Sequence, residues 1–129
     1  LLTAAGHEIA AREIIPDDPD RMRPLLVGYV ARDDVDAILL TGGTGLSSRD
    51  QTMETVGALI TKLLPGYGEI FRMLSFQEIG AAGMLSRAMA GLIEQTVVFT
   101  MPGSPGGVRL AMERLIVPEL GHVVREARR

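Results

Sequence analysis

The chain of 129 residues contains no cysteine, and this absence excludes several kinds of chemistry. Neither a disulfide framework nor a thiolate metal site can form, and no thiol can act as a nucleophile. A reducing compartment is the natural setting for such a chain, so we expect a cytoplasmic protein. The two histidines, His7 and His122, are far apart and have no ligand spacing around them, so a histidine metal site is not expected.

Long apolar runs and clusters of positive charge are also missing. No apolar stretch reaches the roughly 20 residues needed to span a bilayer, and the first residues, LLTAAGHEIA, lack the basic region of a signal peptide. The formal net charge is −3, and the basic residues are scattered apart from those near the C-terminal end. Binding to nucleic acid would need a clustered basic face to neutralise phosphates. We therefore expect neither a nucleic-acid nor a membrane partner.

The composition is that of one globular domain, which we place at residues 1–129. Hydrophobic residues make up 47% of the chain and charged residues 22%, as in an ordinary folded protein. The length allows one domain with a substantial core and is too short for two domains.

Apolar spacing predicts strands that alternate with helices. Strands are predicted at 7–15, 35–40 and 95–101. Helices are predicted at 20–31, between the glycines that follow residue 40 and residue 64, and at 68–76, 81–92, 108–116 and 119–129. Asp18 and Pro19 suit an N-cap and a first helical residue, although Pro24 should move the true start one turn later. The alternation predicts a three-layer α/β/α domain on a mostly parallel central sheet.

The stretch AILLTGGTGLSSRDQT, residues 37–52, joins an apolar strand to a helix through a glycine-rich loop. Gly42, Gly43 and Gly45 permit positive φ and let a ligand approach the bare backbone, as in anion-binding loops. The loop has neither the Gly-Lys-Ser/Thr of a P-loop nor the third glycine of a dinucleotide fingerprint. A tight strand-to-helix connection accounts for the same glycines without a ligand.

Two positions suit the start of the helix that follows this loop. Ser48 could be the N-cap, with Gln51 completing a capping box. Alternatively Thr52 is the N-cap, and then Asp50 lies in the loop and faces the ligand.

A second glycine loop, TMPGSPGGV at residues 100–108, has the same design. It follows a buried strand, and Ser104 and Pro105 suit an N-cap and a first helical residue. Both loops should lie at the carboxyl ends of their strands, where open α/β sheets bind ligands, and two helix N-termini there suit a ligand with several phosphates. Ser104 is explained equally well as a plain helix cap.

Four blocks in order, TGGTGLSSRDQT, PGYGEIFRMLSFQEIG, MLSRAMAG and MPGSPGGV, resemble the molybdenum-cofactor biosynthesis proteins of the MoaB/MogA type, which are related to the gephyrin G domain. The resemblance covers nearly the whole chain and begins at AGHEIAAREIIPDD. It implies the molybdopterin-binding fold and a molybdopterin adenylyltransferase, which with Mg²⁺ turns molybdopterin and ATP into adenylylated molybdopterin and pyrophosphate ahead of molybdate insertion. It also implies self-association as a trimer or hexamer.

The resemblance assigns roles to particular residues. The two catalytic acids of the family correspond to Asp17 of IPDD and Asp50 of SSRD, and both would position Mg²⁺. Asp17 has a rival explanation, because it stands beside Asp18 at a helix start. The phosphate of nucleotide or pterin would bind the loop formed by Gly42, Gly43, Thr44 and Gly45, and the family's PGxP loop corresponds to Pro102, Gly103, Ser104 and Pro105.

The chain departs from the family pattern at its start. Members usually begin with a strand that carries a Ser-Asp motif, and this sequence starts after it, so we expect a domain that lacks that strand. Two other functions stay open. One is a module that binds molybdopterin or nucleotide without turning it over, and the other is a CinA-type nucleotide pyrophosphatase of the same fold, whose loop typically reads TGGLG with an Asp-Asp pair.

Overall fold

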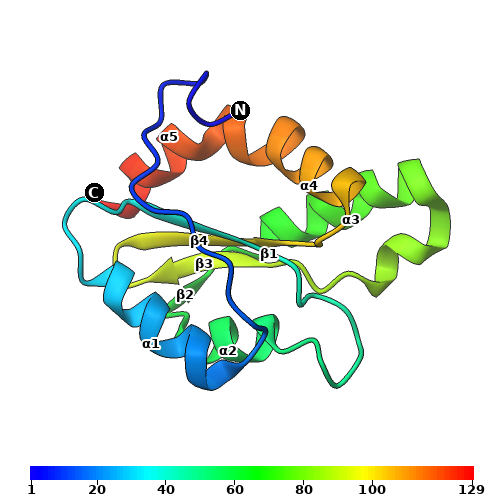
Figure 1. Ribbon diagram of the computed structural model, residues 1–129. Coiled ribbons are helices and arrows are strands. Elements are labelled where there is room, and N and C mark those ends of the chain that lie inside the picture. The colour runs from blue at the N-terminus through cyan, green and yellow to red at the C-terminus, as the bar shows by residue number, and fades with distance from the viewer.

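The computed structural model describes all residues, 1–129, as a four-stranded sheet between two layers of helices (Figure 1). The strands are β1 (Ala37–Thr41), β2 (Lys62–Leu63), β3 (Ala90–Ile93) and β4 (Thr96–Met101), in the spatial order β1-β4-β3-β2. Strand β4 pairs parallel with β1 and antiparallel with β3, and β2 pairs antiparallel with β3. The α/β fold is confirmed, but the sheet is mixed and not mostly parallel, because a tight turn at Glu94 and Gln95 returns β3 directly into β4.

Helices cover both faces of the sheet (Figure 1). Helices α1 (Pro19–Val30) and α2 (Thr52–Leu59) lie on one face, and α3 (Pro65–Ile79), α4 (Pro105–Ala111) and α5 (Val117–Ala127) lie on the other. A 3₁₀ turn, η1 (Gly80–Leu85), follows α3, and a π-helical turn, η2 (Met112–Ile116), joins α4 to α5. No helix combines the length and the apolar character that crossing a membrane requires.

The sheet separates two hydrophobic cores. The larger lies under α3, α4 and α5 and contains Phe71, Phe99 and Ile116, while the smaller lies under α1 and α2 and contains Leu26 and Val56. All six residues of β4 are buried, which confirms the buried strand predicted at 95–101. Strand β1 is only partly buried because it forms an edge of the sheet.

The strand predicted at residues 7–15 is wrong, since this segment forms no strand. Its β-branched residues suit a strand, but no neighbouring strand pairs with its backbone, and Ile14 is fully exposed. A cavity of about 1170 Å³ is lined by this segment together with α1 and β1. Local propensity cannot form a strand without a partner for its N–H and C=O groups.

Helix α1 begins at Pro19, so the predicted shift caused by Pro24 is wrong. Asp18 is the N-cap, and its carboxylate accepts a backbone N–H at 3.0 Å. Pro24 lies on the exposed side of the helix, where it removes one backbone hydrogen bond. The cap and the burial of Met22 and Leu26 hold the first turns in place despite that loss.

Two helical predictions are wrong in part. The helix that follows the first glycine loop ends at Leu59, and β2 takes the place of the predicted last turn. Residues 68–76 are helical as predicted, but the pattern at 81–92 divides between η1 and β3. Apolar runs of this length fit a buried strand and a helix equally well, so sheet pairing decided between them.

Candidate functional site

The two glycine loops meet at one edge of the sheet, as predicted. Strands β1 and β4 run parallel and end at Thr41 and Met101, so both loops leave the sheet at the same end. The Gly42 N–H donates to the Met101 carbonyl at 2.8 Å. A Cβ on Gly103 would lie 3.5 Å from the Cα of Gly42, so the two loops lie side by side.

The glycines of the first loop serve different purposes. Gly42 and Gly43 have φ values of 93° and 70°, which favour glycine. A Cβ on Gly43 would collide with the Thr52 side chain and lie 2.5 Å from Oδ2 of Asp17, whereas a Cβ on Gly42 would meet nothing within 4 Å. Gly43 is therefore required by the packing of the protein itself, and the open space beside Gly42 leaves room for a ligand.

Asp17 reaches the start of α2 from a segment 34 residues away. Its Oδ2 accepts the backbone N–H of Gln51 at 3.0 Å. Gln51 is the N-cap residue of α2 and makes no cap bond with its own side chain, so the helix starts close to the Thr52 alternative and not at Ser48. Asp18 caps α1, as the rival explanation of Asp17 supposes. The bond to Gln51 gives Asp17 a structural role, and its catalytic role stays a prediction.

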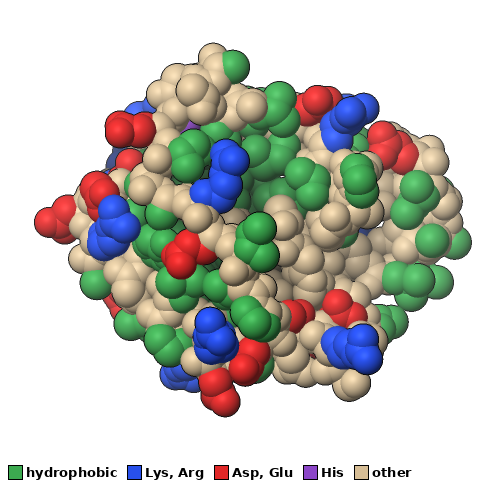
Figure 2. Space-filling view, viewed as in Figure 1, with side chains coloured by type: hydrophobic (Ala, Val, Ile, Leu, Met, Phe, Trp, Pro, Cys, Tyr) green, Lys and Arg blue, Asp and Glu red, His purple; other side chains and the backbone are tan.

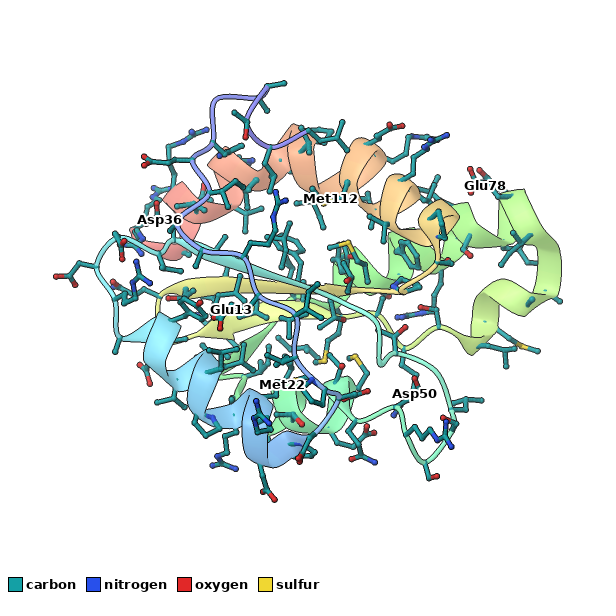
Figure 3. All side chains as sticks on the ribbon, viewed as in Figure 1. Glu13, Met22, Asp36, Asp50, Glu78 and Met112 are labelled. Carbon is teal, nitrogen blue, oxygen red and sulfur yellow. The ribbon has the colours of Figure 1, made fainter.

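Asp50 lies in the loop between β1 and α2 (Figure 3). Its Oδ2 accepts the Ser47 hydroxyl at 2.7 Å and the Ser47 backbone N–H at 3.1 Å. These bonds, the serine hydroxyl first, lower the pKa of Asp50, and the charge of Arg87 acts in the same direction. A Cβ on Gly45 would lie 2.8 Å from this Oδ2. Asp17 and Asp50, far apart in sequence, therefore both contact the glycine loop, and Asp50 is an anion at neutral pH.

Arg87 is a residue of the site whose role the sequence did not reveal. Its backbone N–H donates to the Thr44 carbonyl at 3.0 Å, and its Nε donates to the Gly45 carbonyl at 2.9 Å. The side chain also donates to the Asp50 carbonyl at 3.2 Å and pairs with Glu54. These contacts span more than 30 residues of sequence, so no local spacing pointed to them. Its place in the block MLSRAMAG was the only available signal.

The second loop starts a helix as predicted. The Ser104 hydroxyl accepts the Gly107 N–H at 3.2 Å, and Pro105 is the first helical residue. The helical path continues through η2 to the end of α5, past Pro118. Ser104 is thus a helix cap, and contact of Pro102, Gly103, Ser104 and Pro105 with a ligand stays a prediction.

The donor set of the site suits a hard cation that shares its ligands with a substrate. No group of three or more His, Asp or Glu side chains is placed to hold a metal ion on its own. Asp17 and Asp50 supply two carboxylates, each of which uses Oδ2 for the bonds described above. Mg²⁺ commonly takes one or two protein carboxylates and completes its shell with phosphates and water, so the residue types suit it, and a Mg²⁺ ion held by both carboxylates stays a prediction.

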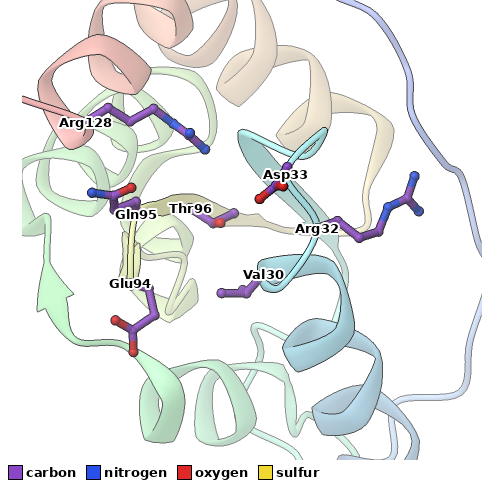
Figure 4. A pocket seen from close by; sticks show the side chains of 7 residues that line it. All are labelled: Val30, Arg32, Asp33, Glu94, Gln95, Thr96 and Arg128. Carbon is purple, nitrogen blue, oxygen red and sulfur yellow. The ribbon is translucent and has the colours of Figure 1, made fainter.

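One cavity reaches the glycine loops, and a second, smaller one does not. The larger, of about 1170 Å³, has Asp17, Gly42, Gly43 and Thr52 among its lining residues and so opens onto the glycine loops. The smaller, of about 390 Å³, lies near the β3–β4 turn and the end of α5 (Figure 4). Because the smaller one mixes basic and acidic side chains, it offers no clear preference for an anion.

Comparison with known proteins gives several close matches. A family model described as a probable molybdopterin binding domain matches residues 1–122. The molybdenum cofactor biosynthesis protein B of Bacillus subtilis (strain 168) is 53% identical over 130 aligned positions, which cover 100% of this chain and 76% of that protein.

Solved structures agree with these matches. A crystal structure of a molybdenum cofactor biosynthesis protein B has a TM-score of 0.93 at 48% identity, with 98% of this chain and 79% of that chain covered. The tungsten cofactor synthesizing protein MoaB from Pyrococcus furiosus has a TM-score of 0.82 at 37% identity, with 91% and 74% covered. The CinA protein of Thermoplasma acidophilum is similar in fold alone. It has a TM-score of 0.59 at 18% identity, and the match covers 95% of this chain and 82% of that chain.

Proposed function

This chain belongs to the family of probable molybdopterin binding domains, whose relatives include the molybdenum cofactor biosynthesis proteins B, and from that premise we propose that it is a cytoplasmic molybdopterin adenylyltransferase. The reaction joins the phosphate of molybdopterin to the α-phosphorus of ATP and releases pyrophosphate. The observation that carries the proposal is the meeting of two glycine loops and two distant aspartates at one edge of the sheet.

Phosphoryl and adenylyl transfer depend mainly on positioning and on neutralising charge. The N-terminal end of α2 would bind phosphate oxygens, since unpaired N–H groups and the helix dipole favour anions there, and the open space beside Gly42 would leave room for them. Asp17 and Asp50 would hold Mg²⁺, which when bound neutralises the charge that develops on the leaving pyrophosphate. A metal is needed beside these carboxylates, because two anions next to a phosphate otherwise repel it.

Self-association as a trimer or hexamer is part of the proposal. Six apolar side chains of α3 and η1 are 44 to 77% exposed and form what we call the α3–η1 face: Ile70, Met73, Phe76, Ile79, Met84 and Leu85. Figure 2 shows hydrophobic side chains gathered over this part of the molecule, at the right-hand edge. Contiguous exposed apolar side chains of this kind mark interaction sites. A second copy of the chain would cover this face.

The proposal is tested by turnover of the purified protein with molybdopterin, ATP and Mg²⁺, following adenylylated molybdopterin and pyrophosphate. We expect both products, and Asp50→Asn should lower kcat by about 100-fold or more, as loss of a key electrostatic group does. Asp17→Asn should behave alike. Asp33→Asn is the control, since Asp33 lines the remote small cavity and its variant should keep full turnover.

Other outcomes assign other functions. Binding of molybdopterin with no release of pyrophosphate would replace the enzyme by a non-catalytic binding module. Hydrolysis of a nucleotide pyrophosphate bond without molybdopterin would favour the CinA-type pyrophosphatase. Full turnover in Asp50→Asn would refute the role given to that carboxylate.

A further inference from the structure

Arg87 holds the first glycine loop from the side of β3. It lies in the short coil between η1 and β3, and it bonds to the loop at both of its ends. At one end its backbone N–H and its Nε bind the carbonyls of Thr44 and Gly45, at 3.0 and 2.9 Å. At the other end its Nη2 binds the carbonyl of Asp50, at 3.2 Å. The loop between these points carries the Ser47 that binds the Asp50 carboxylate.

Glu54 of α2 completes the arrangement. Its two carboxylate oxygens accept from the two terminal nitrogens of Arg87, one of them at 3.3 Å. The guanidinium therefore contacts the loop and the first turn of α2 at once. The ion pair lowers the pKa of Glu54 and raises that of Arg87, so both groups stay charged.

The guanidinium is occupied by the protein and not free for a phosphate. A guanidinium has five N–H donors in a planar fork, and this one makes four side-chain bonds, to Gly45, Asp50 and twice to Glu54. Its side chain is 32% exposed. An arginine that served as a phosphate ligand would leave its fork open toward the ligand.

We propose that Arg87 is a positioning residue, which fixes the segment from Gly45 to Asp50 and thereby sets where the Asp50 carboxylate stands. The inference rests on the proposed function, because it concerns the same site. Lysine cannot replace this arginine, since one ammonium cannot reach three acceptors that lie in different directions around a flat fork.

The test compares Arg87→Lys and Arg87→Ala with the wild type and with Arg32→Lys. Arg32 makes a similar two-point pair with Asp34, at 2.8 and 2.6 Å, on a surface away from the loops, which makes it the matched control. In the turnover assay we expect kcat to fall by about 10-fold in Arg87→Lys and by about 100-fold in Arg87→Ala, because small displacements of reacting groups are costly. KM for ATP and for molybdopterin should change by less than about 3-fold, because backbone N–H groups bind the phosphates.

A second readout needs no activity. The loop contains an exposed Arg49, so trypsin can cut between Arg49 and Asp50 once the loop opens. In ligand-free protein we expect the rate of this cleavage to be at least about 3-fold higher in Arg87→Lys than in the wild type, since local opening governs such cleavage. Mass spectrometry of the fragments measures the rate. Arg32→Lys should match the wild type in both readouts. If Arg87→Ala does not fold, Glu54→Gln replaces it, since it removes the charge that holds the guanidinium.

Each alternative result overturns the inference. A higher KM with unchanged kcat would make Arg87 a phosphate ligand. Faster cleavage with unchanged kcat would make its role structural only, and unchanged cleavage would mean that it does not hold the loop. If the wild type itself forms no product, the proposed function fails separately, and the cleavage rate alone then supports or refutes the hold on the loop.

Discussion

Single residues of the glycine loop set the ionisation and the position of the Asp50 carboxylate. Asp50 is partly exposed to water, and its ionised form is favoured by local hydrogen bonds from Ser47. Gly45 is required beside it because any Cβ there would press on the carboxylate. The main cause of the lowered pKa of Asp50 is therefore a neighbour three residues away, which is visible in the sequence SSRD, while the distant Arg87 adds to it.

Replacement of Ser47 by alanine should raise the pKa of Asp50 toward its ordinary value. The hydroxyl bond is the largest cause of the lowered pKa, and the backbone bond remains in the variant, so part of the lowering should persist. A folded pKa below the unfolded value adds stability above the ordinary pKa of 3.8, and that stability is lost as pH falls through the lowered value. Carboxyl ¹³C titration by NMR measures the shift. Ser48→Ala is the control, and an unchanged pKa in Ser47→Ala would contradict the prediction.

At the scale of elements, helix starts place most of the site. Helix α4 begins at its own cap, Ser104, whereas at the start of α2 the N–H of Gln51 donates to the carboxylate of the distant Asp17. Both helices follow parallel neighbouring strands, so their starts face the same edge of the sheet. Cap and ligand contact compete for the same few N–H groups at these starts.

Ser104→Ala should lower the free energy of unfolding by about 1 kcal/mol, as loss of a helix cap does. Ser104→Asp should keep the cap and the stability, because aspartate caps helices equally well. If this loop binds phosphate, the added negative charge should weaken ATP binding in Ser104→Asp. Urea unfolding and calorimetric titration measure the two effects. Unweakened ATP binding in Ser104→Asp would leave Ser104 as a helix cap only.

On the scale of the whole molecule, one surface carries many exposed apolar side chains. The α3–η1 face continues through residues 79–86, IGAAGMLS, a stretch without a charged side chain. The same stretch leads directly into Arg87, so a second copy seated on this face would lie next to the residue that holds the glycine loop. The proposed association would therefore be connected to the site through one short segment.

Ile79→Glu should reduce the assembly to smaller species, because a charge would be buried in the interface. Ile79 is 62% exposed in the α3–η1 face, so the monomer itself should fold normally. Val27→Glu is the control, since Val27 is 51% exposed on α1, outside this face. Sedimentation or light scattering gives the mass. A wild type that sediments as a monomer would refute the proposed self-association, and an unchanged oligomer in Ile79→Glu would move the interface elsewhere.

Much of the fold followed from local pattern. The buried strand at 95–101, the caps at Asp18 and Ser104, and the glycine loops at the ends of two strands were all predictable, because each depends on residues that are near neighbours in sequence. The segments 7–15 and 81–92 were not. Their apolar residues permit more than one structure, and the presence or absence of a pairing strand decided the outcome.

The sequence by itself determined the glycine loops, their helix starts and, through four short blocks, the family. Tertiary structure alone decided which distant groups meet there: Asp17 with Gln51, and Arg87 with Gly45, Asp50 and Glu54. The physical reason is the range of the interactions. A cap or a glycine turn is a choice among few backbone angles made within a few residues, whereas a contact across more than 30 residues exists only after the sheet has paired and both cores have packed around it.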